Sequence, residues 1–424
     1  MQALGILRDY LSIKREERLD RDSLEELQKK KLSRMLDYAS QTDHYGRIMA
    51  ENSIRPSDIL GDLTSIPITE KQDVHAAPTS LIPRPIKKGS LFVFTTSGST
   101  GIPMKIYGDQ QALNFRIALV YAHEIAQGRS PSELFAVIAR ELYVPQHPFL
   151  AATGLFRKLY LSANTPEEKN YDALCKSKAK VFKTYPSVLT ILSKLNNQEN
   201  KKMKLRSIIS TGEMLSKNTR KLAEESFSCP VYDHYGVWET RSVGWECPEE
   251  RNLHVNGSSC ILEIVDENGK PKKTGVGDII ITSLHNKAMP FIRYRVGDRG
   301  SLGKDCPCGR GYPVLKELEG RTSEFIVLPS GKIHSASALG ISRIESFFAD
   351  VLQYQIIQEK EDLFVVKYTG KELSSETEKE AIKMIRESCN EDVQVEFEHV
   401  ASIKRGRTGK ISRIICKVKP KRAL

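Results

Sequence analysis

Residues 95–105 of the chain, TTSGSTGIPMK, combine hydroxyl side chains, glycines and a basic residue in one short segment. The backbone N–H groups of a glycine-rich turn can converge on one anion, and hydroxyl groups add further donors. A polyphosphate is the natural ligand of such a loop, and Lys105 can add positive charge. The segment lacks the Walker spacing of glycine and lysine, so it is not a P-loop of that class. On composition alone, an ordinary surface loop is the alternative.

The residues on either side of this loop favour a ligand site. LFVFTT, from Leu91, predicts a short buried strand that leads into the loop, and QQALNFRIALVYAHEIAQG predicts a helix that ends near Gly128. Loops that follow strands in α/β sheets commonly carry ligands. We therefore expect this loop to bind a polyphosphate.

Four other residues have the chemistry of a metal site. Cys247 and His254 lie in WECPEERNLHV, and Cys306 and Cys308 lie in CPCGRG later in the chain. Three thiolates and one imidazole form a closed tetrahedral set that suits structural zinc. The Cys-x-Cys spacing is tighter than usual, and four unrelated residues are the alternative. The remaining cysteines are expected to be reduced and structural: Cys175, Cys229, Cys260, Cys389 and Cys416.

Residues 1–55 have helical periodicity, and residues 54–74 are rich in turn formers and predict irregular structure. Short apolar strands then alternate with helices. The strands are predicted in LFAVIA, AKVFKTY, LRSIISTG and CPVYDHYG, and the helices in PSVLTILSKL and SKNTRKLAEESF. This alternation indicates an α/β domain with a largely parallel sheet.

The pattern changes after Cys260, where CILEIVDENGKP and GVGDIIITSL predict two strands around an Asn-Gly turn. Beyond Gly320, YQIIQEKEDLFVVKYTG predicts a hairpin, SSETEKEAIKMIRESC a helix and VQVEFEHV a strand. We therefore expect an α/β protein with two domains. Residues 1–321 form a large N-terminal domain of mixed sheets and helices, and residues 322–424 form a small α+β domain.

The net charge of +11 comes almost entirely from one end of the chain. Residues 401–424 contain nine Lys or Arg and no Asp or Glu, whereas the rest of the chain has 55 basic and 53 acidic residues. No aromatic residue is interleaved with these charges, which argues against nucleic acid as a partner. The segment either meets a polyanion or is a solvated terminus. We see no apolar run long enough to span a bilayer and no secretory signal, so we expect a cytoplasmic protein without integral membrane contact.

Five motifs occur in a fixed order along the chain. They are TTSGSTGIPMK, YGVWE at 235–239, RYRVGD at 293–298, GRTSEFIVLPSGK at 320–332 and RGRTGKISR at 405–413. Together they resemble the phosphate loop, the Y-G-x-x-E segment, the ribose-binding segment, the hinge and the terminal lysine motif of the adenylate-forming, acyl-CoA synthetase-like enzymes. LSRMLDYASQTDHYGRI, IPITEKQDV, TSLHNKAMPFIRYRVGD and CPCGRG resemble the phenylacetate–CoA ligase branch, including members found in polysaccharide clusters.

The resemblance implies that a carboxylic acid is activated with ATP and Mg²⁺ through an acyl-adenylate, with release of pyrophosphate. It implies that the phosphates contact the loop residues Thr96, Ser97, Gly98, Ser99, Thr100 and Gly101. Such chemistry depends on positioning and on charge placed opposite the departing phosphates.

The resemblance also assigns roles to single residues. Glu239 matches the position that contacts magnesium, and a surface acid is the alternative. Tyr235 and Gly236 match the segment beside the adenine, and Asp298 matches the acceptor of the ribose hydroxyls. The remaining assignments are Arg321, close to the ribose and phosphate, and Lys410, which approaches the α-phosphate and the substrate carboxylate.

The hinge departs from the family pattern, since Ser323 stands where relatives usually have an acidic residue. LPSGKIHSASAL also departs from the phenylacetate ligases and is closer to the polysaccharide-cluster relatives. These departures leave the acceptor of the acyl group open. Coenzyme A is the first expectation, giving acyl-CoA and AMP, and an amine, a hydroxyl or a carrier-protein thiol is the alternative. A non-catalytic nucleotide-binding protein is a third reading, against which the matched Glu239, Asp298, Arg321 and Lys410 argue.

The acid itself is not identified by the sequence. STGEM, VYDHYGVWETRSVGW and ARELYVPQHPF are candidate walls of its pocket. Aromatic rings in these segments could stack on an aromatic acid or form plain core, namely Trp238, Trp245, Tyr143 and Phe149. His147 and His234 could be polar contacts or structural groups. The assembly state is left open, a homodimer included.

Overall fold

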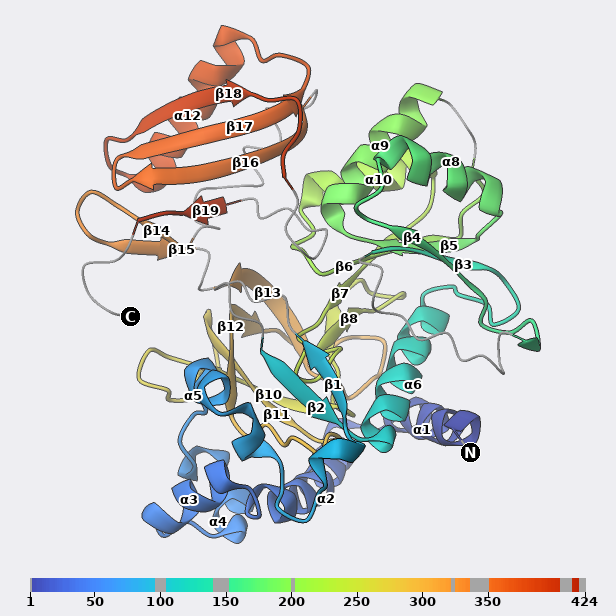
Figure 1. Cartoon of the computed structure of the whole chain (residues 1–424), viewed down its shortest axis with the longest axis vertical. Helices are drawn as coiled ribbons and strands as arrows, with labels where there is room; N and C mark the ends of the chain where they lie inside the picture. Colours follow the sequence, from blue (N-terminus) through green and yellow to red (C-terminus); the bar gives the residue numbers. More distant parts are fainter. Residues whose placement is uncertain are drawn as a thin grey trace. The chain divides into compact units, whose positions relative to one another are not determined.

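The structure is a computed structural model of the chain. It describes residues 2–95, 104–139, 152–199, 203–321, 325–335, 351–404 and 414–418 (Figure 1). These residues form two compact units. The first unit joins Met1–Gly128 with Tyr232–Leu318, and the second joins Arg129–Val231 with Glu319–Leu424. None of the helices in the described ranges has the length and hydropathy of a bilayer-spanning segment.

The N-terminal part of the first unit is helical, as predicted, with α1 Gln2–Glu16, α2 Arg21–Ala39 and α3 Asp43–Glu51. The Asp20 carboxylate caps α2 by accepting from the Ser23 N–H at 2.8 Å. The prediction of irregular structure for residues 54–74 was wrong in part, because α4 Pro56–Gly61, η1 Leu63–Ser65 and α5 Lys71–Ala76 lie there. Pro56, one of the turn formers in this segment, is the first residue of α4, a position that proline favours.

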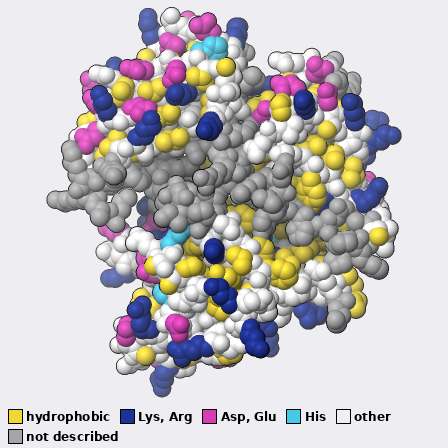
Figure 2. Space-filling view, in the orientation of Figure 1, with side chains coloured by type: hydrophobic (Ala, Val, Ile, Leu, Met, Phe, Trp, Pro, Cys, Tyr) yellow, Lys and Arg dark blue, Asp and Glu magenta, His cyan; other side chains and the backbone are white. Residues whose placement is uncertain are grey.

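The predicted phosphate loop joins the two strands of a hairpin. β1 Phe92–Thr95 pairs antiparallel with β2 Lys105–Gly108, and their register ends with Thr95 opposite Lys105. The prediction that β1 is buried was wrong, since Phe92 and Val93 are 42% and 50% exposed. Figure 2 shows hydrophobic side chains on the surface over this hairpin. A two-stranded hairpin has too few neighbours to cover both faces of an apolar strand.

The helix predicted after the loop is confirmed as α6 Gln110–Ala126, which is capped by Asp109. Two short 3-10 helices precede β1, namely η2 Pro78–Leu81 and η3 Lys88–Ser90.

The strands of the first unit lie in the order β10-β11-β12-β13-β9-β8-β7. Their bounds are β7 Val231–Tyr235, β8 Gly244–Glu246, β9 Leu253–Val255, β10 Cys260–Val265, β11 Gly277–Ser283, β12 Tyr294–Leu302 and β13 Val314–Arg321. β10 and β11 form the antiparallel hairpin that the sequence predicts. The core beneath this sheet includes Ile279, Ile281, Phe291 and Tyr294, all fully buried.

The second unit contains parallel strands in the order β6-β5-β3-β4, of which β6, β5 and β3 were predicted from the sequence and β4 was not. They are β3 Phe135–Ala139, β4 Lys158–Ser162, β5 Val181–Thr184 and β6 Ser207–Thr211, accompanied by α8 Glu167–Ser177, α9 Pro186–Glu199 and α10 Lys217–Phe227. Each helix follows a strand, which is why the parallel arrangement could be predicted.

The C-terminal part of the second unit has its own core, built from β16 Val351–Lys360, β17 Leu363–Gly370, α12 Ser375–Cys389, β18 Gln394–His399 and β19 Ile414–Cys416. The β16–β17 hairpin, α12 and β18 confirm the predicted order, and the sheet runs β18-β17-β16-β19. A small hairpin, β14 Phe325–Val327 with β15 Ile333–Ser335, contributes Ile326 to the same core. A separate α+β domain at this end is thus confirmed, while the boundary between residues 321 and 322 stays a prediction.

A partly buried histidine makes the first unit sensitive to acid. The His285 ring stacks on Phe115 of α6 at 4.7 Å between centroids, and its Nε2 is buried. Loss of hydration, together with the nearby positive charges of Arg116 and Lys31, lowers the pKa of His285 from 6.5 to about 3. The unfolded chain therefore binds more protons than the folded chain between pH 6.5 and 3, so stability falls as the pH drops through this window.

We expect the substitution His285→Phe, which keeps a ring against Phe115, to remove this acid sensitivity. The substitution removes the contact between His285 Nδ1 and the Ser259 carbonyl oxygen. That oxygen still accepts a hydrogen bond from the Leu284 N–H, so it is not left without a donor. Between pH 7 and pH 5 the variant should lose about 2 kcal/mol less of its free energy of unfolding than the natural protein. Urea denaturation at both pH values measures the difference. Equal losses in the two proteins would contradict the assignment.

Candidate nucleotide and metal sites

Tyr235 and Asp298, which the sequence assigns to adenine and ribose, lie together in the structure. The Tyr235 hydroxyl at the end of β7 donates to Oδ2 of Asp298 in β12 at 2.6 Å. Both residues are buried, with 9% and 7% of their surface exposed. A short hydrogen bond to a carboxylate in a buried setting is strong and directional. The tyrosine therefore fixes the orientation of the carboxylate.

A β-bulge aims Asp298. In the pairing of β11 with β12, Asp278 lies opposite Arg299 and Ile280 lies opposite Arg295. Between these two pairs β12 has more residues than β11, which has a single one, and this excess forms the bulge. Gly297 lies within this stretch at a φ of +83°, a conformation that side chains rarely adopt. Bulges commonly re-aim a side chain beside an active site. The glycine in RYRVGD is thus needed to present the aspartate.

The two arginines of RYRVGD anchor this segment. Arg293 is buried and donates to the carbonyl of Ile66 at 3.0 Å and to the Glu263 carboxylate at 3.2 Å. Arg295 donates to the Glu70 carboxylate at 2.9 Å and also pairs with Asp278. Their positive charges are therefore compensated locally, and their role in this arrangement is to hold β12 in place.

The YGVWE segment makes a tight turn after β7. A Cβ at Gly236 would lie 2.2 Å from the Arg241 carbonyl oxygen, so only glycine fits there. The Arg241 N–H donates back to the Val237 carbonyl at 2.7 Å. The turn leaves Glu239 buried, with 7% exposed. Glu239 is therefore not a surface acid, and its contact with magnesium stays a prediction.

Several predicted site residues lie outside the described residues. These are Thr96, Ser97, Gly98, Ser99, Thr100 and Gly101 of the phosphate loop, Tyr143, His147 and Phe149 of the candidate pocket, Ser323 of the hinge and Lys410. Arg321 ends β13, and its side chain is not among the described ones. The roles of all these residues stay predictions from the sequence.

The four predicted metal ligands come together. Cys247 follows β8, and His254 lies in β9. Cys306 and Cys308 lie in the connection from β12 to β13. The strand β13 pairs with β9, with Val314 opposite His254, and this pairing brings the connection close to the histidine. The ligand atoms all lie within 4.8 Å of one another, and Cys308 Sγ is 3.3 Å from His254 Nε2. Tetrahedral zinc requires about 3.5 to 3.8 Å between such atoms. Small shifts of these four ligand atoms would therefore give the geometry of a zinc site.

Two donors that the sequence analysis missed face the sulfur atoms. Arg310 Nη1 lies 3.7 Å from Cys247 Sγ, and Asn252 Nδ2 lies 3.4 Å from Cys306 Sγ. Burial acts to raise the pKa of the Cys308 thiol, but hydrogen bonds from Arg310 outweigh it and the pKa is lowered. Three thiolates with one Zn²⁺ carry a net charge of −1, which the Arg310 guanidinium can balance. Such surrounding donors are typical of metal sites.

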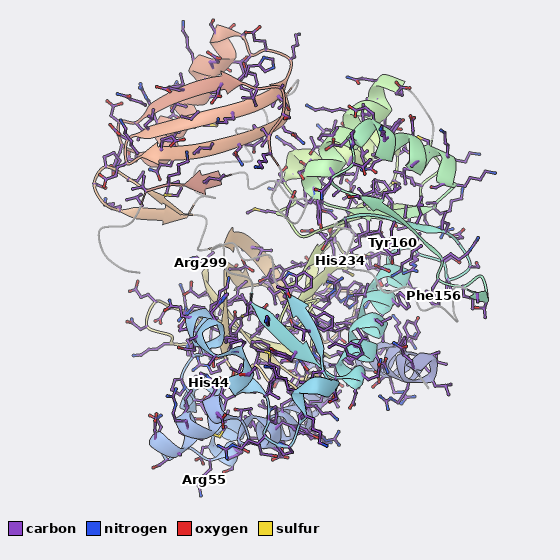
Figure 3. All side chains as sticks on the ribbon, in the orientation of Figure 1. His44, Arg55, Phe156, Tyr160, His234 and Arg299 are labelled. Carbon is purple, nitrogen blue, oxygen red and sulfur yellow. The ribbon has the colours of Figure 1, made fainter. Side chains whose placement is uncertain are left out.

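Three of the aromatic and histidine candidates for the acid pocket lie among the described residues, and they differ in burial. Trp245 is fully buried and stacks on His123 at 4.7 Å, so it is core. The Nε2 atom of His234, a residue labelled in Figure 3, lies 2.6 Å from Gln127 Oε1. The Gln127 amide in turn donates to the Glu246 carbonyl. His234 therefore donates to Gln127 and helps to hold β7 against α6. Trp238 is only partly buried.

The chain is similar to proteins of known families. Residues 50–286 match the model described as AMP-binding enzyme, and residues 331–417 match the CapK C-terminal domain. A phenylacetate-coenzyme A ligase of Thermus thermophilus is 25% identical over 406 residues, covering 90% of this chain and 88% of that protein. Protein CapK of Staphylococcus aureus is 22% identical over 360 residues, covering 81% and 78%.

Solved structures agree with this fold. A 2-hydroxyisobutyryl-CoA ligase, crystallised in the postadenylation state, superposes with a TM-score of 0.79 at 19% identity, covering 95% of this chain and 91% of that one. The predicted fold class, with a large N-terminal domain and a small C-terminal one, is thus confirmed.

Proposed function

Since the chain belongs to the AMP-binding enzyme family, we propose that it activates a carboxylic acid with ATP and transfers the acyl group to coenzyme A. The similarity to phenylacetate-coenzyme A ligases and to the CapK C-terminal domain places it in the phenylacetate–CoA ligase-like branch. The structural observation that carries the proposal is the buried Tyr235–Asp298 pair, aimed by the bulge at Gly297. The reaction uses ATP and coenzyme A, which are available in the cytoplasm, and we propose that the enzyme works there.

In this proposal the described residues hold the nucleoside end of ATP. Asp298 accepts hydrogen bonds from the ribose hydroxyls, and Tyr235 keeps the carboxylate in the orientation that this requires. Glu239 offers a carboxylate oxygen to Mg²⁺, the hard ligand that this ion prefers. The ion, when bound, neutralises charge on the phosphates as pyrophosphate departs.

The phosphate end of ATP is assigned from the sequence. We propose that the hydroxyls and N–H groups of residues 96–101 cradle the departing phosphates, and that Arg321 lies near the ribose and phosphate. Lys410 meets the charge that grows at the α-phosphorus as the acid attacks. Preorganised groups of this kind act because they need no rearrangement during the reaction.

A screen of acids tests the proposal. The purified protein is mixed with ATP, Mg²⁺ and single members of a panel of aryl and alkyl acids, and pyrophosphate is followed with and without coenzyme A. Acid-dependent release together with a coenzyme A-dependent acyl thioester supports the ligase. Failure of every acid to release pyrophosphate would contradict acid activation.

Two comparisons support a different acceptor of the acyl group, namely the match to the CapK C-terminal domain and the similarity to Protein CapK. In this second candidate function the acyl-adenylate forms in the same way, but an amine, a hydroxyl or a carrier protein receives the acyl group during polysaccharide or secondary-metabolite assembly. Pyrophosphate release without transfer to coenzyme A would select it.

We also propose that the Cys247, His254, Cys306 and Cys308 cluster holds a structural zinc ion. The closed set of four protein ligands leaves no position for a substrate, which argues for a structural rather than a catalytic metal. The ion would tie the β8–β9 hairpin to the connection between β12 and β13, and so would support the strands that carry Tyr235 and Asp298.

The substitution Tyr235→Phe tests the nucleotide site. It removes a hydrogen bond to a buried carboxylate, a loss typically of about 1.5 to 3 kcal/mol. We expect kcat/KM for ATP to fall about 10- to 100-fold, with the KM for the acid little changed. Tyr232→Phe is the matched control, since Tyr232 is a similarly buried tyrosine of the same strand that packs against Arg251 instead. Equal ATP kinetics for Tyr235→Phe and the natural protein would remove the pair from the nucleotide site.

A further inference from the structure

Arg116 is a buried cation to which no motif assigns a role. It lies in α6, beside the β1–β2 hairpin (Figure 1), and only 6% of the residue is exposed. Burying a guanidinium is costly unless hydrogen bonds and nearby π-systems compensate it. The groups that Arg116 contacts therefore indicate what its burial achieves.

The first contact is with the backbone of the YGVWE segment. Arg116 Nη2 donates to the carbonyl of Trp238 and lies 3.4 Å from the carbonyl of Glu239. These carbonyls belong to the tight turn that buries the Glu239 side chain. The guanidinium thus binds the backbone that sets the position of this carboxylate.

The second contact is with the strand that leads into the phosphate loop. The guanidinium carbon of Arg116 lies 4.8 Å from the centroid of the Phe94 ring, within the range of a cation–π contact. Phe94 precedes Thr95, the last residue of β1, and the predicted phosphate ligands begin at Thr96. A single planar side chain therefore touches the strand that leads into the phosphate loop and the backbone of the proposed magnesium ligand.

We propose that Arg116 is a positioning residue for adenylation, which holds the end of β1, where the phosphate loop starts, against the turn that carries Glu239. The inference rests on the proposed function. Pyrophosphate and Mg²⁺ must be held together as the acid attacks, and an error of about 1 Å in such an arrangement can cost about 100-fold in rate. Lysine is a poor substitute, because a point charge cannot both stack on Phe94 and reach two carbonyls.

Kinetics of Arg116→Met and Arg116→Lys test the proposal. We expect Arg116→Met to lower kcat for acid-dependent pyrophosphate release about 10- to 100-fold and to raise the Mg²⁺ concentration for half-maximal rate, with the KM for the acid unchanged. Arg116→Lys should recover only part of the rate. The control is Arg129→Met, which removes another buried arginine, held in the second unit between the rings of Phe135 and Phe156 (labelled in Figure 3).

Hydrogen exchange separates positioning from general loss of stability and needs no turnover. We expect faster exchange of backbone amides in residues 92–95 and 236–241 in Arg116→Met, with unchanged exchange in β10 and β11. A Met variant that keeps the natural kcat, Mg²⁺ dependence and exchange would overturn the proposal, as would faster exchange spread evenly over the first unit. If no acid supports turnover in the natural protein, the proposed function fails and the exchange pattern still decides the role of Arg116. Should the Met variant fold poorly, the same measurements on Arg116→Lys decide it.

Discussion

Replacing Lys410 with alanine is expected to slow acid-dependent pyrophosphate release about 100- to 1,000-fold while the fold stays intact. The resemblance places this ammonium against the α-phosphate and the acid carboxylate, where negative charge grows as the acyl-adenylate forms. The loss of one preorganised charge contact of this kind typically has an effect of this size. Initial rates of pyrophosphate release with the preferred acid measure it, and circular dichroism checks the fold.

Lys404→Ala is the matched control, because Lys404 is an exposed lysine of the same basic segment. The control should keep its rate, which would separate a specific role of Lys410 from the general charge of residues 401–424. Near-normal release by the Lys410 variant would remove this lysine from the mechanism.

Replacing Cys306 with serine is expected to abolish zinc binding and to destabilise the first unit. Removing one of four ligands opens the site, and loss of a structural metal belongs to the changes that cost about 4 kcal/mol or more. For a domain of this size the expected fall in Tm is about 10 °C. Metal analysis of the purified natural protein should give about one zinc per chain, and thermal unfolding should show the fall in the variant.

The control for the metal site is Cys175→Ser, since Cys175 lies in α8 of the second unit, outside the cluster. That variant should keep its zinc and its Tm. A natural protein that is stable and active without any metal would contradict the zinc assignment. The four residues would then contribute to the fold through packing and hydrogen bonds alone.

Local patterns in the sequence predict most of the elements. Short apolar segments that alternate with helices identify the parallel strands β3, β5 and β6 but not β4, and the Asn-Gly turn identifies the β10–β11 hairpin. The errors arise where tertiary context decides. LFVFTT has the composition of a buried strand, but within the described ranges it pairs only with β2, so Phe92 and Val93 stay exposed.

The candidate sites are predictable where residue type carries the chemistry. Three cysteines and a histidine suggest a metal site even though Cys247 and His254 lie far from Cys306 and Cys308 in the sequence. The segments YGVWE and RYRVGD likewise suggest a nucleotide site. The supporting residues could not be predicted in the same way. Arg116 acts on carbonyls more than a hundred residues away, and the bulge at Gly297 depends on the register of β11, so neither leaves a local pattern.

The most direct test of the account is a crystal structure of the protein soaked with ATP and Mg²⁺. We predict that the ribose hydroxyls lie within hydrogen-bonding distance of Asp298, with the adenine beside Tyr235 and the phosphates along residues 96–101. A nucleotide bound in the crystal away from both Asp298 and Ser97 would contradict the account.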